Sequence, residues 1–186
     1  MITQDVIEKL FAELKPILSP QVLKQVSKLS NLLIQGNNII CHGVGREGLV
    51  MRALTMRLYH LGFNAHVLGD MTSPPVSAGD VFFVSAGPGY FSTVHALVKI
   101  AKKNKAKTIS ITAEPEGKIP KMVDFIVSIP AQTMASDTAN SSRSILPMGS
   151  LFEVVMFLFF ELLVIDLQEK LNISKEQMRI KHTNME

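Results

Sequence analysis

The pattern of apolar and polar positions along the chain predicts short buried strands that alternate with helices. Five short stretches are rich in apolar residues and carry almost no charge, which is typical of strands buried on both faces of a parallel sheet. They are Asn38–His42, Ala65–Leu68, Val81–Ser85, Thr108–Thr112 and Phe125–Ile129. Helical spacing separates most of them, so the sequence predicts an α/β fold in which right-handed crossovers place helices on both faces of the sheet.

The same pattern divides one predicted domain, residues 1–186, into five parts. Two N-terminal helices, Ile2–Leu18 and a second that starts at Ser19-Pro20 and stops at Gly36, occupy residues 1–36. Residues 38–130 form the sheet core, with helices over Glu47–Leu61 and Val94–Lys103. Ser92 or Thr93 is the expected N-cap of the latter helix. A polar loop covers residues 131–148, an apolar helix 149–171, and a short helix or tail 174–186.

The helix over residues 149–171 is apolar nearly all round. Glu153, Glu161 and Asp166 interrupt it, and each would be costly inside a bilayer, so we do not expect it to span a membrane. A helix without a polar face has to be covered on every side, which indicates a subunit interface in addition to the core. The polar loop at residues 131–148 is equally consistent with a lid over a ligand and with a flexible segment.

Two glycine-containing turns each connect a strand to a helix. One is Gly43–Gly48 after the first strand, and the other is Ala86–Gly89 after the third. Such a turn presents free backbone N–H groups and the positive end of the helix dipole, which together attract an anion such as phosphate. Most turns of this kind use glycine only for its geometry, so either turn taken alone is weak evidence for a phosphate site.

Composition excludes several classes of protein. The formal net charge is +3, but the lysines and arginines are spread over several predicted helices, and with no Trp and two Tyr there is little to stack on bases. We therefore expect no nucleic-acid partner. Cys41 is the one cysteine in the chain, so no internal disulfide can form. The first residues lack the basic and apolar regions of a secretory signal, which predicts a cytoplasmic protein.

Several motifs resemble those of the 6-phospho-3-hexuloisomerases, which are single-domain members of the sugar isomerase (SIS) family. The motifs are Gly43–Gly48, Met56–Phe63, the loop from Gly69 to Pro74, Pro147–Glu153 and the ending Lys181–Glu186. The resemblance implies an α/β/α sandwich with a five-stranded parallel sheet, and a homo-oligomer, expected to be a tetramer, with active sites between subunits. It also implies a sugar phosphate as ligand, no metal or cofactor, and interconversion of 3-hexulose 6-phosphate and fructose 6-phosphate.

Two positions depart from the family pattern. Where the family's phosphate loop reads Ser-Gly-Ser-Gly-Glu-Thr, this chain has Ala86–Phe91, without those hydroxyl groups. Glu47 stands where the family has Ser, and its carboxylate would repel a phosphate unless Arg46 neutralises it. The residues that we expect to bind the sugar or its phosphate are Gly45, Arg46, Glu47, Thr72, Ser73, Ser85, Gly87, Gly89, Ser92 and Thr93. Alternatively, Arg46 forms a surface ion pair with Glu47, and Thr72 and Ser73 cap the turn before Pro74.

The resemblance assigns catalysis to Glu153 and His182. Moving a carbonyl group between adjacent carbons needs a base, and Glu153 matches the family's proposed base. Apolar neighbours would raise its pKa toward the working range. The alternative is a capping box, in which Glu153 reaches back toward Ser150 at the helix start. His182 matches a histidine that can reach a neighbouring subunit's site, but a C-terminal histidine is more often an exposed tail residue.

Three hypotheses follow. The first is an isomerase of a hexulose 6-phosphate with Glu153 as base. The altered Ala86–Phe91 loop motivates the second, a module that binds or senses a sugar phosphate without turnover. Glu47 motivates the third, an isomerase whose substrate is a different phosphosugar or carries no phosphate.

Overall fold

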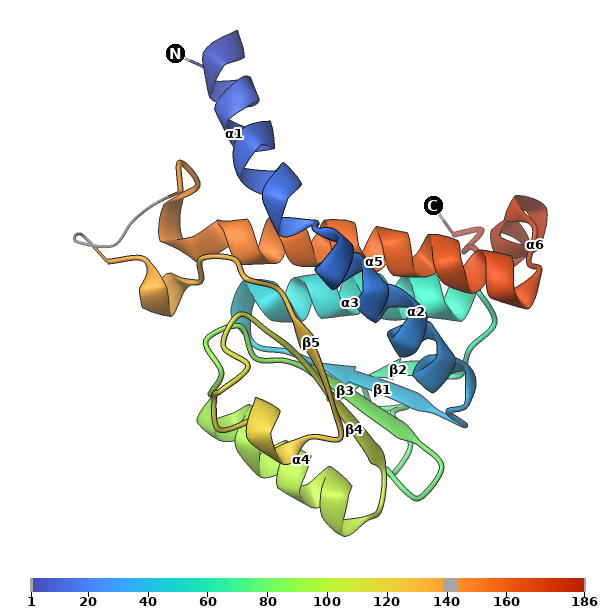
Figure 1. Cartoon of the computed structure of the whole chain (residues 1–186). Helices are drawn as coiled ribbons and strands as arrows, with labels where there is room; N and C mark the ends of the chain where they lie inside the picture. The colour runs from blue at the N-terminus through green and yellow to red at the C-terminus, as the bar shows by residue number, and fades with distance from the viewer. Residues whose placement is uncertain (1, 139–143, 186) are drawn as a thin grey trace.

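A five-stranded parallel sheet in the order β2-β1-β3-β4-β5 organises the chain (Figure 1). This computed structural model describes residues 2–138 and 144–185. The strands are β1 (Ile39–His42), β2 (Ala65–Val67), β3 (Val81–Ser85), β4 (Lys107–Thr112) and β5 (Phe125–Ser128). The central strand β3 is buried at every position, as its uninterrupted apolar sequence predicts. The predicted fold class is confirmed.

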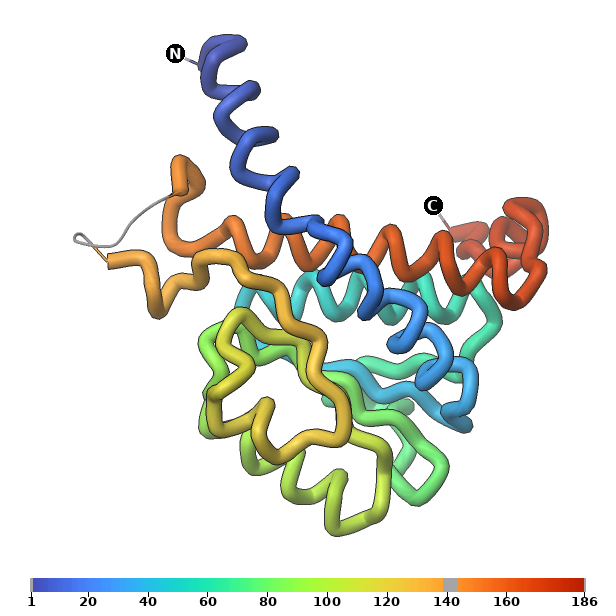
Figure 2. The backbone as a smooth tube through the Cα atoms, in the orientation of Figure 1, coloured from blue at the N-terminus to red at the C-terminus, as the bar shows by residue number. Residues whose placement is uncertain are grey.

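Helices cover both faces of the sheet, but unequally. They are α1 (Gln4–Ile17), α2 (Pro20–Ile34), α3 (Gly45–His60), α4 (Ser92–Lys103), α5 (Ser150–Leu171) and α6 (Lys175–Ile180), with short 3₁₀ helices η1 (Pro120–Met122), η2 (Met134–Ser136) and η3 (Pro147–Gly149). One core cluster joins α2, α3 and α5 to the sheet, and a smaller one joins α4 to the opposite face. The tube in Figure 2 shows α1 leading away from these layers toward the N-terminus.

The start of α4 differs from the prediction. Its N-cap is Phe91 in extended conformation, not Ser92 or Thr93, and no side chain caps the helix. The Phe91 carbonyl accepts the bond from the His95 N–H at 2.9 Å, and its ring packs on the core beneath α4. Apolar packing of Phe91, rather than a hydroxyl group, therefore determines where this helix begins.

The apolar helix α5 is the core helix of the larger cluster. By length and composition alone, residues Pro147–Leu171 would suffice to cross a membrane, but 56% of the most apolar window is buried inside the protein. Phe159, Leu163 and Leu167 are fully buried in the cluster with α2 and α3. Other apolar side chains of α5, among them Phe157 and Ile165, are 46% and 53% exposed. The core thus covers one side of α5 and leaves apolar surface on the other.

The sheet order creates a switch point between β1 and β3. From β1 the chain passes through α3 to β2 at the edge, and then returns to β3 on the other side of β1. The turns that follow β1 and β3 consequently lie next to each other at the carboxyl edge of the sheet, the usual place for a ligand in this type of fold. Gly48 allows α3 to start close to β1, because a Cβ there would lie 2.6 Å from the Gly43 carbonyl oxygen.

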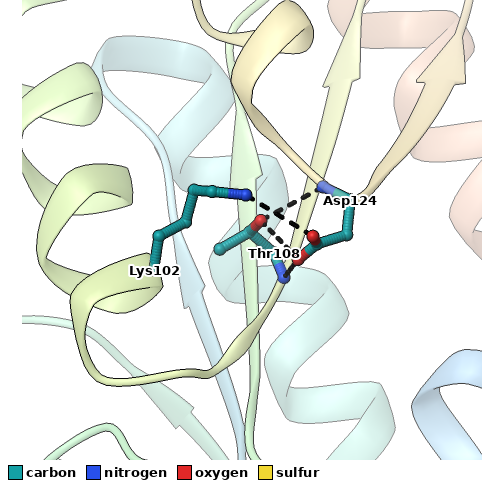
Figure 3. A network of polar contacts seen from close by, with 3 residues as sticks. All are labelled: Lys102, Thr108 and Asp124. Carbon is teal, nitrogen blue, oxygen red and sulfur yellow. Dashed lines mark hydrogen bonds and ion pairs between the residues drawn. The ribbon is translucent and has the colours of Figure 1, made fainter.

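A polar network joins the amino-terminal ends of β4 and β5, at the end of the sheet opposite the switch point (Figure 3). The Asp124 carboxylate accepts hydrogen bonds from the Thr108 N–H and hydroxyl, both at 2.8 Å, and Lys102 Nζ lies 3.4 Å away. Burial raises the pKa of the Asp124 carboxyl, but these bonds and the charges of Lys102 and Lys107 outweigh it. The pKa therefore lies below its ordinary value of 3.8. The ionised carboxylate stabilises the fold.

Replacing Asp124 with Asn is expected to lower the free energy of unfolding by about 1–2 kcal/mol at pH 7. Because the folded pKa is depressed, this stabilisation is present above the ordinary pKa and is lost as pH falls through the folded value. Urea unfolding of the wild type and the variant at pH 7 and pH 3 measures the cost of the substitution and its dependence on pH. Lys102→Met is the control, expected to cost at most about 0.5 kcal/mol because that ion pair is partly exposed. A cost of Asp124→Asn that does not change with pH would contradict the assignment.

Candidate active site

A pocket of about 600 Å³ lies at the carboxyl edge of the sheet, at the switch point. Its walls come from the start of α3, the β3–α4 turn, residues 133–135, and the segment that enters α5. Charged side chains in the lining include Arg46, Glu47 and Glu153. Much of the remaining wall is apolar, with Val44, Pro88, Phe91, Met134, Met148 and Phe152. An apolar cavity with a few converging charged groups is typical of a small-molecule site.

Glu153, on the first turn of α5, faces Arg46 across this pocket. Its Oε2 atom lies 3.0 Å from Arg46 Nε, and the side chains are 16% and 62% exposed. Within the described part of the chain, Oε2 accepts no hydrogen bond. Burial raises the pKa of Glu153, and the Arg46 charge lowers it, with a net increase. A carboxylate with a raised pKa that lines a pocket beside a cation can take a proton from a ligand.

The alternative role for Glu153, a capping box with Ser150, is wrong. Gly149 is the N-cap of α5, in the left-handed region, and no side chain caps the helix. Two backbone N–H groups at the helix start are bonded to other partners instead. The Phe152 N–H donates to the Gln132 carbonyl at 3.2 Å, and the Gly149 N–H donates to the Asp137 carboxylate at 3.1 Å. The Glu153 side chain is therefore available to the pocket.

Glu47 is almost fully buried and bonds to the neighbouring turn. Its Oε2 atom accepts a hydrogen bond from the Ser85 hydroxyl and another from the Gly87 N–H at 2.9 Å. Burial raises the pKa of Glu47, the two hydrogen bonds lower it, and the charge of Glu153 raises it further, with a net increase. Arg46 pairs with Glu153, 107 positions along the chain, so the expected alternative of an Arg46–Glu47 surface ion pair is not formed.

The structure brings some of the predicted ligand-binding residues together and leaves others apart. Gly45, Arg46 and Glu47 line the pocket. Ser85 and Gly87 do not line it but donate hydrogen bonds to Glu47, and Gly89 belongs to the β3–α4 turn with Gly87. Ser92 and Thr93 are exposed at the start of α4. Thr72 lines a different cavity of about 340 Å³. The Ser73 hydroxyl is buried without a hydrogen-bond partner among the described residues. Their roles in binding stay predictions.

His182 lies far from Glu153 within one chain. Its ring centroid is 5.3 Å from that of His60, at the C-terminal end of α3, whereas Arg46 is at the N-terminal end. The rise of a helix separates these two ends by about 20 Å. His182 contributes instead to a cavity of about 840 Å³ together with Met56 and Tyr59. One chain alone therefore does not place both predicted catalytic residues at one site.

The predicted polar loop, residues 131–148, supplies part of the pocket wall, although residues 139–143 lie outside the described residues. Met134 and Met148 line the pocket and are 67% and 69% exposed. The Glu13 carboxylate of α1 accepts bonds from the Ser144 hydroxyl at 2.6 Å and the Ile145 N–H at 2.9 Å. Sequence reasoning missed the two methionines, because nothing in their local pattern distinguishes a pocket wall from a surface position.

A doubly covered parallel sheet with a charged pocket at its switch point is typical of α/β proteins that bind small molecules at the carboxyl edge. A family model of the SIS domain matches residues 32–158. The chain therefore belongs to the SIS domain family.

Two curated relatives are named 3-hexulose-6-phosphate isomerase. The protein from Bacillus subtilis is 34% identical over 165 residues, which cover 88% of each chain. The protein from Mycobacterium gastri is 35% identical over 163 residues, which cover 88% of this chain and 81% of the relative. A solved structure from Methanococcus jannaschii, for which a function of 3-hexulose-6-phosphate isomerase has been inferred, has a TM-score of 0.82 at 26% identity and covers 98% of both chains. These relatives confirm the resemblance found in the motifs.

Proposed function

We propose that this protein is a sugar-phosphate isomerase that interconverts 3-hexulose 6-phosphate and fructose 6-phosphate in the cytoplasm. The observation that carries the proposal is the Glu153 carboxylate, which lines the pocket 3.0 Å from Arg46 and has a pKa that burial raises. The names of the curated relatives support the choice of substrate.

In this mechanism Glu153 removes the proton from C2, the hydroxyl-bearing carbon next to the C3 carbonyl. The C2–H electrons form the C2=C3 double bond, and the C3 oxygen takes up a proton, which gives an enediol. Glu153 then returns its proton to C3 while the C2 hydroxyl loses its proton and becomes the carbonyl. Negative charge develops on the oxygens during both transfers, and the Arg46 guanidinium is near enough to the base to stabilise it.

The decisive experiment is to incubate the purified protein with 3-hexulose 6-phosphate and to measure fructose 6-phosphate over time. Turnover that saturates with substrate supports the proposal, and the reverse reaction should reach the same equilibrium ratio. Other phosphosugars and unphosphorylated fructose, tested in parallel, measure the specificity. No turnover of any of them would reject the isomerase assignment.

A second candidate is a module that binds a sugar phosphate without turnover. The specific observation in its favour is the β3–α4 turn, where Ala86–Phe91 lacks the hydroxyl groups of the family's phosphate loop. A phosphosugar that raises the melting temperature of the protein without being converted would favour this second function.

The distance between Glu153 and His182 leads to a proposed oligomer. Both residues can act on one substrate only if they come from different subunits, because α3 separates their sites by about 20 Å within a chain. Apolar side chains such as Phe11 on α1 (64% exposed), Leu49 on α3 (65%) and Phe157 on α5 offer a surface for a second copy. A homotetramer meets both requirements, and His182 then serves the substrate oxygens as proton donor and acceptor.

Light scattering is expected to give a mass of about four times the 20.5 kDa of one chain. Phe157→Glu should reduce this mass, because it places a charge in a desolvated interface. Ile100→Glu is the matched control, since Ile100 is a similarly exposed apolar residue on α4, across the sheet. A mass of 20.5 kDa under assay conditions would contradict the proposed assembly.

A further inference from the structure

The turn between β3 and α4 has no backbone donor left for a ligand at residues 86–89. The Ala86 N–H bonds to the Ile111 carbonyl at 2.9 Å, and the Gly89 N–H bonds to the Ala86 carbonyl at 2.8 Å. Pro88 has no N–H group. The Gly87 N–H donates to Glu47 Oε2 at 2.9 Å. Of these donors, the Gly87 N–H is the one bonded to a side chain. A ligand could therefore bind this N–H if the Glu47 carboxylate alone were displaced or neutralised.

The Glu47 carboxylate is buried and closely packed against the β3–α4 turn. Its residue is 7% exposed, and the same Oε2 atom accepts the hydroxyl of the fully buried Ser85. A Cβ atom at Gly87 would lie 2.6 Å from Glu47 Oε1 and 2.9 Å from the Phe152 ring, so the carboxylate fills the space that the missing side chain leaves. An anion thus already sits against the turn, and it belongs to the protein.

We propose that Glu47 determines which anions this pocket accepts: its carboxylate holds the Gly87 N–H and the Ser85 hydroxyl as an internal anion, and the phosphate group of a ligand has to compete with it for these donors. The proposal names a phosphomonoester as the ligand class, and in this respect it rests on the proposed function. Competition arises both because the donors are shared and because two negative charges would meet in a partly desolvated site.

The competition should depend on pH. The charged or titratable groups that line the pocket with Glu47 are Arg46 on its own helix, Glu153 from α5 and Tyr90 from the β3–α4 turn. Burial and the Glu153 charge keep the pKa of Glu47 above its ordinary value despite the bonds from Ser85 and Gly87. Protonation removes the competing charge, so the affinity for an anion at this turn should rise as pH falls toward that pKa.

Sulfate is a suitable probe, because its charge does not change between pH 5 and pH 8. We expect Glu47→Gln and Glu47→Ser to bind sulfate about 10- to 100-fold more tightly than wild type at pH 8, measured by calorimetry. Glu161→Gln is the matched control: it removes the same charge from the partly exposed pair with Arg57, outside the pocket lining, and should leave sulfate binding nearly unchanged. The wild-type affinity should increase at pH 5, and Glu47→Gln should lose most of this pH dependence.

Three results would overturn the proposal: equal effects of Glu47→Gln and Glu161→Gln, a pH dependence that persists in full in Glu47→Gln, or no sulfate binding by Glu47→Gln at pH 8. Melting curves establish that each variant folds, and the wild-type pH series requires no variant. Sulfate binding does not depend on turnover. A protein that binds sulfate as expected but converts no hexulose 6-phosphate would therefore reject the proposed function and leave the role of Glu47 standing.

Discussion

Replacing Glu153 with Gln is expected to lower the turnover of 3-hexulose 6-phosphate by about 10²- to 10⁴-fold, the usual contribution of a positioned general base. Gln keeps the shape of the side chain but cannot take up the proton from C2. The fold should change little, since the substitution removes only the ion pair with the largely exposed Arg46, worth at most about 1 kcal/mol. Values of kcat and KM, together with the melting temperature, separate loss of chemistry from loss of folding.

The pH dependence provides the control for this prediction. The base has to be ionised, so wild-type activity should fall as pH decreases through the pKa of Glu153, which burial raises. Arg46→Gln removes the charge that lowers this pKa, so the acidic limb of the pH profile should move to higher pH. If Glu153→Gln retains wild-type turnover, or the limb stays in place in Arg46→Gln, Glu153 is not the base.

Replacing Gly149 with Ala is expected to lower the free energy of unfolding by about 3 kcal/mol or more. Gly149 has a φ of +69°, and a Cβ there would lie 2.0 Å from both the Met134 nitrogen and the Thr133 carbonyl carbon. These are backbone atoms that cannot rotate away. Either α5 or residues 133–134 must shift, so the pocket wall should move together with the loss of stability. Chemical denaturation and substrate KM measure the two effects.

Gly69→Ala is the matched control for Gly149→Ala. Gly69 also has a positive φ, of +101°, but no atom lies within 4 Å of the position that a Cβ would occupy. Its substitution should therefore cost only the backbone strain, about 1–2 kcal/mol. Equal costs at the two positions would show that strain, and not the approach of Thr133 and Met134, requires glycine at Gly149.

The sequence was sufficient to predict the strands and the fold class, because these depend on local patterns. The uncharged run Val81–Ser85 and the glycine turn that follows it determine a buried strand at the centre of a parallel sheet. The strand order could not be read in the same way, since it depends on pairing between distant segments. The start of α4 was misplaced because a local rule about hydroxyl caps was outweighed by packing of the Phe91 ring.

The candidate site was likewise predictable only where it depends on local sequence patterns. The glycine turns indicated the correct edge of the sheet, but the partners of the charged residues there are distant in sequence. Arg46 pairs with Glu153 and Glu47 bonds to Gly87, so neither the Arg46–Glu47 pair nor the Ser150–Glu153 capping box forms. Each of those expected interactions joins neighbours in sequence. The observed interactions require the fold to bring α3, the β3–α4 turn and α5 together.

The proposed base is part of the same helix as the centre of the core. Glu153 belongs to the first turn of α5, and later turns of that rigid rod carry Phe159 and Leu163, which are fully buried. Moving the backbone of Glu153 would disturb the packing of these core side chains, so the place from which the carboxylate enters the pocket is as persistent as the folded state. Adjustment to substrates of different size therefore falls to other parts of the pocket wall, where the exposed, flexible thioethers of Met134 and Met148 can rearrange at little energetic cost.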